Sequence, residues 1–139
     1  MLVLLDSNIF ISALLAPFGA PATIYEAWLQ KRFRIVTCQV QIDEIRVACR
    51  NPKFRGRLQP HLVGEMLNNL YRATVWPAPI PRKHQAADPA DNYLLDLIDA
   101  AEPDYAITGD KRAGILQLNS LGGTKIVTAS IFAASVLHL

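Results

Sequence analysis

The sequence predicts an α/β protein with a parallel β-sheet of about five strands. Short apolar runs of strand length, such as Leu2–Leu5, alternate along the chain with longer segments that carry helix start and stop signals. This alternation favours a parallel sheet, because two parallel strands need a crossover connection, which is usually a helix. The chain has 139 residues, 51% of them hydrophobic, so we expect a single domain with a buried core.

The strands are expected where short apolar or β-branched runs are bounded by polar or turn residues. Leu2–Leu5 is continuously apolar, as in a parallel strand that is buried on both faces. The other expected strands are Arg34–Thr37, Ala73–Trp76, Tyr105–Thr108 and the short Ile126–Val127.

The helices are expected between these strands. Pro17 ends the first helix, Pro21 lies near the start of the second, and Pro52 stops the third. Residues 53–58 form a basic connection, and residues 77–87, with three prolines, form a loop. The expected helices are Asn8–Leu15, Ala22–Lys31, Val40–Arg50, Leu62–Tyr71, Pro89–Ala101 and Ser130–Leu137.

Four acidic residues follow expected strands. Asp6, Glu44, Asp91 and Asp110 each lie at the carboxyl end of a strand or in the first turn of the next helix. In a parallel sheet these ends open onto one crevice, where ligands bind. Four carboxylates there repel each other, and a hard divalent cation, Mg²⁺ or Mn²⁺, is the simplest way to hold them together. Such sites commonly act on phosphates.

Each of these acids also has a structural explanation. Asp6 can cap the helix that follows it, and Asp91 can be an acid favoured by the helix dipole. Glu44 can be a surface-edge residue, and Asp110 a simple turn residue. Because all four would lie at one edge of one sheet, a shared site is the better explanation.

Helical wheels separate the candidate acids from solvated ones. Glu44 lies on the opposite side of its helix from the polar stripe of Asp43 and Arg46. Asp91 lies on the apolar face of its helix, whereas Asp96 lies on the far side and should be solvated.

Three further polar residues flank the four acids. Asp88 suits the cap position of a helix whose first residue is Pro89, and it can equally contact a metal through water. Asn8 offers a nearby oxygen ligand or a cap, and Thr108 can orient a carboxylate or a metal-bound water. No cysteine or histidine spacing indicates a zinc site, and the two cysteines are too few for a disulfide framework.

The net charge of +2 conceals an uneven distribution of charge. If several acids gather in one pocket, the remaining surface is distinctly basic. A cluster of four basic residues suits a polyanion such as RNA, although ordinary solvated loops carry similar charges. This basic cluster is Arg50, Lys53, Arg55 and Arg57.

The ordered set of motifs closely resembles the PIN domain family. These motifs are D-S-N after the first strand, an early helical Glu, D-P-A-D-N at a helix start and T-G-D after a late strand. N-P-K-F at residues 51–54 and I-V-T at residues 126–128 resemble bacterial PIN-family toxins of toxin–antitoxin systems, which are similar to VapC-type toxins. The resemblance covers nearly the whole chain and implies a Rossmann-like, three-layer α/β/α fold with residues 1–139 as one PIN-like domain.

The resemblance also implies a metal-dependent ribonuclease. Asp6, Glu44, Asp91 and Asp110 match the catalytic and metal-binding acids, and Asp88 matches a fifth acid of the subgroup. Asn8 and Thr108 match supporting polar positions. In the expected reaction one or two metal ions activate a water, so cleavage leaves 5′-phosphate and 3′-hydroxyl ends.

Two other functions are compatible with parts of the sequence. Phosphoryl transfer through an aspartyl phosphate would use Asp6 as nucleophile, but related phosphatases need a second Asp where Asn8 stands. A catalytically inactive PIN-like module that binds RNA or protein is the other alternative.

Partners and location are predicted from the apolar segments. Residues 129–137 are apolar almost all round, so we expect a homodimer or a cognate antitoxin to cover them, unless they only fill the second face of the sheet. No apolar run approaches the length of a membrane span, and no leader is recognised at the start. We therefore expect a cytoplasmic protein without a membrane partner.

Overall fold

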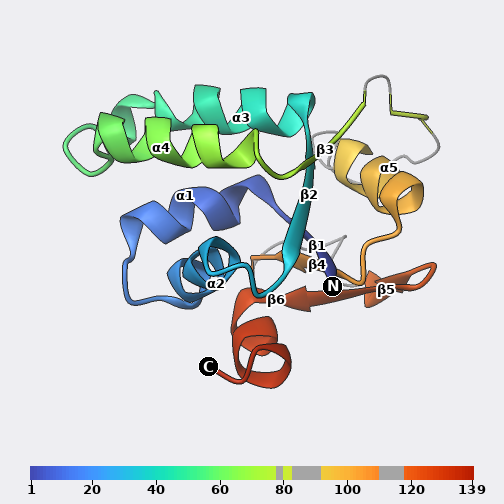
Figure 1. The fold of residues 1–139 in the computed structure, drawn as a ribbon. Helices are drawn as coiled ribbons and strands as arrows, with labels where there is room; N and C mark the ends of the chain where they lie inside the picture. Colours follow the sequence, from blue (N-terminus) through green and yellow to red (C-terminus); the bar gives the residue numbers. More distant parts are fainter. Residues whose placement is uncertain (78–79, 83–91, 110–117) are drawn as a thin grey trace.

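The structure, a computed structural model, describes residues 1–77, 80–82, 92–109 and 118–139 (Figure 1). Its centre is a six-stranded sheet with the order β3-β2-β1-β4-β6-β5. Five strands are parallel to their neighbours, and β5 runs antiparallel to β6. The strands are β1 (Leu2–Leu5), β2 (Arg34–Cys38), β3 (Thr74–Trp76), β4 (Tyr105–Thr108), β5 (Ser120–Leu121) and β6 (Thr124–Thr128).

The strand order places β1 in the middle of the sheet. The chain passes from β1 to β2 and β3 on one side, then returns to β4 on the other side of β1. The boundary between β1 and β4 is therefore the point where the strand order reverses, and ligands of open α/β sheets bind at such a point. The predicted α/β fold with a largely parallel central sheet is confirmed.

The short strand β5 was not predicted. It forms a two-residue hairpin with β6, in which Leu121 pairs with Thr124 across Gly122 and Gly123. Gly122 has φ +59°, a left-handed conformation that favours glycine. The Gly-Gly pair is a hairpin signal, but two-residue strands are too short to show an alternating pattern.

All six expected helices are present, and their described ends differ from the prediction by at most two residues. The described helices are α1 (Ser7–Leu15), α2 (Ala20–Leu29), α3 (Gln39–Cys49), α4 (Pro60–Leu70), α5 (Asn92–Ala101) and α6 (Ala129–Ile131), which continues as the π-helical turn η4 (Phe132–Val136). A short 3-10 turn, η1 (Pro52–Phe54), lies within the connection expected to be basic. The expected start of α5 at Pro89 lies outside the described residues.

The two faces of the sheet are covered by different helices, which gives three layers (Figure 1). Side chains alternate along β1: Val3 and Leu5 pack toward α1, α2 and α3, whereas Leu4 packs toward α5. Ile107 and Ala106 of β4 divide between the same two cores. This packing fixes β1 between two layers, so the residue after it has a defined position.

The closing helix is buried on one side only. Phe132 and Leu137 are buried, and the Phe132 ring lies 5.6 Å from Phe33 and 5.4 Å from Tyr105, measured between ring centroids. Ile131, by contrast, is 50% exposed. The segment that looked apolar all round therefore packs one face onto the sheet and α2, and leaves the other face open.

The prediction that Asp96 is solvated is wrong, because this residue is only 5% exposed. Five consecutive residues of α5, Leu94 to Ile98, are buried. A helical wheel assumes a wide exposed stripe, but α5 is covered around most of its circumference.

Among the described residues, no single helix is long and apolar enough to cross a membrane. The pair α1 and α2 passes the test of length and composition only together, with a bend of 101° between them.

Candidate active site

Asp6 lies at the carboxyl end of the central strand. Its backbone N–H donates to the carbonyl of Ile107 in β4 at 2.9 Å, which joins the two strands at the point where the order reverses. Its carboxylate accepts a hydrogen bond from the N–H of Asn8 at 3.3 Å, so Asp6 is the N-cap of α1. The residue is only 2% exposed. The capping role considered for Asp6 is therefore real, and it fixes the carboxylate at the crevice.

Glu44 approaches the same region from α3, where it is half-buried. The connecting group is Tyr93 of α5, whose hydroxyl lies 3.0 Å from the Ser7 hydroxyl. Burial raises the pKa of Tyr93, the negative charges of Glu44 and Asp6 raise it further, and the hydrogen bond with Ser7 opposes these effects. Glu44 and Asp6 therefore both contribute to the negative potential at the Tyr93 hydroxyl.

A buried hydrogen-bonded chain supports this point from the β2 side. The Thr37 hydroxyl donates to the side-chain oxygen of Gln41 at 2.5 Å, and the Gln41 amide donates to the carbonyl of Leu5 at 2.6 Å. The chain connects β2, α3 and the end of β1, and so holds α3 against the residue before Asp6. Buried polar groups that are satisfied in this way rigidify a site.

The supporting residues Thr37, Gln41 and Tyr93 were not predicted from the sequence. One signal was present, because Gln41 lies four residues before Ile45, and both are fully buried on the inner side of α3. The contact of Ser7 with Tyr93 spans 86 residues and carries no local signal.

The two predicted supporting residues differ in their surroundings. Thr108 is 3% exposed, and its hydroxyl donates to the carbonyl of Gly109 at 3.0 Å. Asn8 is exposed at the start of α1. Both lie at the edge of the sheet where β1 and β4 end, as the sequence predicted.

Asp88, Asp91 and Asp110 lie outside the described residues, so only part of the predicted acidic site is visible. Within the described part of the chain, no three His, Cys, Asp or Glu side chains gather in a way that would hold a metal ion. The visible contribution to such a site is the pair Asp6 and Glu44.

The chemistry of this pair fits a hard cation. Carboxylate oxygens are the ligands that Mg²⁺ and Mn²⁺ prefer. The neighbouring soft donor is Cys38, and burial raises the pKa of its thiol, which favours the protonated form that does not bind metal. The described donors therefore suit an oxygen-bound divalent ion better than zinc.

The basic cluster Arg50, Lys53, Arg55 and Arg57 lies at the tip of the α3–α4 pair, at the end of α3 remote from β2 (Figure 1). The tip is shaped by η1: the Asn51 side chain accepts from the N–H of Lys53 at 3.1 Å, and the Lys53 ammonium lies 4.9 Å from the Phe54 ring centroid. A cavity of about 410 Å³ at the tip is lined by Arg50 and Arg55. Residues 45–64 contain no acid.

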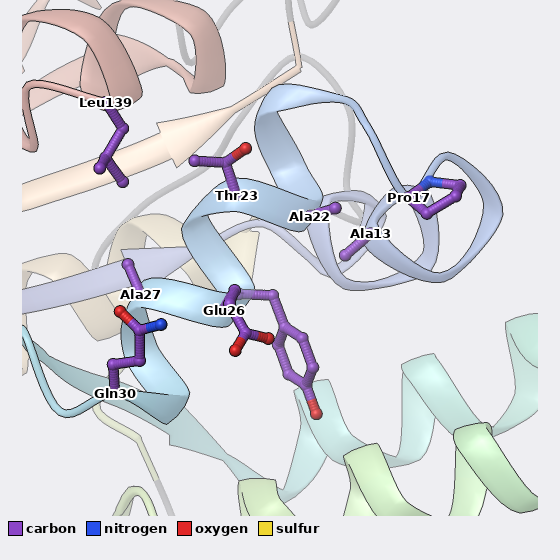
Figure 2. Close-up of a pocket in the computed structure, with 9 residues that line it drawn as sticks. Ala13, Pro17, Ala22, Thr23, Glu26, Ala27, Gln30 and Leu139 are labelled. Carbon is purple, nitrogen blue, oxygen red and sulfur yellow. The ribbon is translucent and has the colours of Figure 1, made fainter.

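A second cavity, of about 500 Å³, lies along α2, away from the predicted site residues. Figure 2 shows Glu26 and Gln30 at this cavity, with Pro17 and Leu139 at its borders. None of the predicted site residues lines it.

Comparison with known proteins gives one family. Residues 2–112 match the family described as PIN domain, a range that contains all the predicted acids. An uncharacterized protein of Methanocaldococcus jannaschii is 28% identical over 110 residues, which cover 78% of this chain and 70% of that protein. No solved structure gives a significant match.

Proposed function

The chain belongs to the PIN domain family, and we propose that it is a metal-dependent endoribonuclease that hydrolyses phosphodiester bonds of RNA. PIN domains are generally nucleases, so the family supports the class of enzyme. The observation that carries the proposal is Asp6, a buried carboxylate held at the point where the strand order of a parallel sheet reverses. Glu44, which acts on the same phenol, adds a second carboxylate.

In this proposal Asp6 and Glu44, together with Asp88, Asp91 and Asp110, would hold Mg²⁺ or Mn²⁺. When bound, such an ion lowers the pKa of a water and offsets negative charge on the phosphate. The protein's own part is to fix the donors. Asp6 is oriented by the N–H of Asn8, and the hydroxyl of Thr108 lies at the end of the neighbouring strand.

The basic cluster is proposed to hold the RNA backbone. Its four cations lie on a hairpin tip without acids, and Arg50 follows Glu44 by six residues on α3, roughly 9 Å along the helix axis. An RNA strand that reaches the carboxylates is therefore close enough to place a neighbouring phosphate at the tip.

The biological role that we propose is that of a toxin in a toxin–antitoxin pair, on the strength of the sequence resemblance. Such an enzyme needs a partner that blocks its acidic crevice until cleavage is required. A cognate antitoxin that covers apolar surface and reaches the carboxylates with a basic side chain would do so.

Cleavage of total RNA by the purified chain tests the enzymatic proposal. We expect cleavage with Mg²⁺ or Mn²⁺, none in EDTA, and 5′-phosphate and 3′-hydroxyl ends when the products are sequenced. Asp6→Asn and Glu44→Gln should abolish cleavage. Asp43→Asn is the matched control, because Asp43 adjoins Glu44 but pairs with Arg46 at 3.0 Å on the exposed side of α3.

Two results would overturn the proposal. Full activity in EDTA would exclude the metal, and 2′,3′-cyclic phosphate ends would show that the RNA's own hydroxyl is the nucleophile. A chain with no cleavage under any condition, but with RNA affinity, would instead support the inactive RNA-binding module.

A further inference from the structure

A small cavity lies at the edge of the sheet where β1 and β4 end, and Asn8, two residues after Asp6, is part of its lining. Its volume is about 190 Å³, roughly the share of six liquid water molecules. It is formed where β1 and β4 end and where α2 and α6 begin. Its lining includes Asn8, Ser12, Gly109 and Ser130, with Ala20 and Pro21 as apolar wall.

Most of the cavity's lining surface is apolar, and none of the described residues that line it is charged. Its polar side chains are one amide, from Asn8, and two hydroxyls, from Ser12 and Ser130. None of these three side chains makes a hydrogen bond within the described part of the chain. They are thus available as neutral donors and acceptors for a ligand.

This chemistry does not suit a phosphate. A phosphate site is usually built from Arg, Lys or a row of backbone N–H groups. Among the described residues the lining contains no cation, and Pro21 lacks an N–H at the second position of α2. An apolar wall with a few neutral hydrogen-bonding groups suits an uncharged part of a nucleotide, and the two serine hydroxyls can pair with the hydroxyls of its sugar.

The position of the cavity relates it to the proposed cleavage site. Asn8 donates its backbone N–H to Asp6, and Gly109 follows Thr108 at the end of β4. If the phosphate of a nucleotide lies at the carboxylates, the adjoining sugar would lie close to Asn8 and Gly109. Because the 2′-hydroxyl is what distinguishes RNA from DNA at a given site, hydroxyls at this position would read the sugar.

We propose that this cavity is a ribose-binding subsite in which the Ser12 and Ser130 hydroxyls recognise the 2′-hydroxyl of the nucleotide next to the cleaved bond. The inference rests on the proposed ribonuclease function and adds the feature that selects RNA over DNA. Ser12 and Ser130 are specificity residues in this account, because they touch the sugar and not the reacting phosphate.

Binding in EDTA tests the subsite separately from cleavage. The probes are a fluorescently labelled single-stranded RNA, the DNA of the same sequence, and RNAs with one 2′-deoxy position each. The wild-type chain should bind RNA more tightly than DNA, and one deoxy position should account for most of the difference. Ser12→Ala with Ser130→Ala should reduce the RNA preference about tenfold, equivalent to about 1.4 kcal/mol.

Ser135→Ala is the matched control, because Ser135 is an exposed serine of η4 that lines none of the cavities described above. It should leave the preference for RNA unchanged, and melting curves should show that all variants are folded. An equal loss of RNA and DNA affinity in the double variant, or a wild-type chain without preference for RNA, would overturn the subsite. RNA-selective binding without cleavage would uphold the subsite and refute the nuclease proposal.

Discussion

Asp6 combines two roles that the sequence presented as alternatives. It caps α1, and it presents a buried carboxylate at the crevice between β1 and β4. The cap holds the Asp6 carboxylate in one position, which is also what a ligand site requires. At the scale of single residues, a structural role and a functional role are therefore compatible.

The charge of Asp6 should cost stability when no metal is bound. Asp6→Asn keeps a good N-cap but removes a negative charge near Glu44. We expect the free energy of unfolding in EDTA to stay the same or to rise by about 1–2 kcal/mol, while cleavage is lost. Melting curves in EDTA measure this. A large fall in melting temperature would show that Asp6 is purely a structural cap.

The sequence located single residues well where local rules apply. The sequence predicted that Asp6 follows a strand and that Thr108 ends one, because the pattern of a strand predicts its carboxyl end. The burial of Asp96 and the contact of Ser7 with Tyr93 could not be predicted in this way. Both depend on how α5 packs across the sheet, which no local pattern specifies.

At the scale of elements, the α3–α4 pair connects the two halves of the proposed site. Its inner end carries the buried Gln41, Glu44 lies midway along α3, and the tip carries the basic cluster. One rigid hairpin therefore sets the distance between the carboxylates and the cations.

Removal of the tip cations should weaken RNA binding in a salt-dependent manner. The double variant Arg50→Ala with Arg55→Ala should lower affinity and reduce the slope of log K against log salt by about 0.7 for each lost phosphate contact. Titrations at several salt concentrations measure this slope. Arg34→Ala is the control, because Arg34 is exposed at the opposite, amino end of β2.

An unchanged salt slope in the double variant would show that the tip is an ordinary solvated loop. An equal change of slope in Arg34→Ala would show that binding follows overall charge and not this tip.

The order of elements was predictable, and their exact ends were less so. Proline and glycine signals gave the helix boundaries to within a few residues. The strand β5 was not predicted, because it contributes only two residues to its hairpin with β6. The one-sided burial of the closing helix was also not predicted, because it depends on packing against the neighbouring α2 and not on the helix's own composition.

At the scale of the whole molecule, apolar side chains remain exposed in the α1–α2 connection and near the C-terminus. Phe18 is fully exposed, Ile131 is 50% exposed and Leu139 is 59% exposed. Pro17, which precedes Phe18, lines the cavity along α2 together with Leu139 (Figure 2). Apolar surface of this kind is usual at protein–protein contacts.

We expect the chain to form a homodimer through this surface. Sedimentation velocity over a range of concentrations should show reversible association, and Ile131→Lys should weaken it. Val47→Lys, which changes an apolar residue that is 66% exposed on α3, should leave association unchanged. A strict monomer at all concentrations would contradict the homodimer and leave a cognate antitoxin as the expected partner, which co-purification from the native host would test.

The central position of β1 also determines when the crevice can exist. Asp6 follows β1 directly, but the strand that completes its edge, β4, comes about a hundred residues later in the chain. At ~5–20 residues per second, Asp6 waits roughly 5–20 seconds for Ile107. The edge of the sheet at which Asp6 lies is therefore unfinished until β4 has been synthesised and has paired with β1.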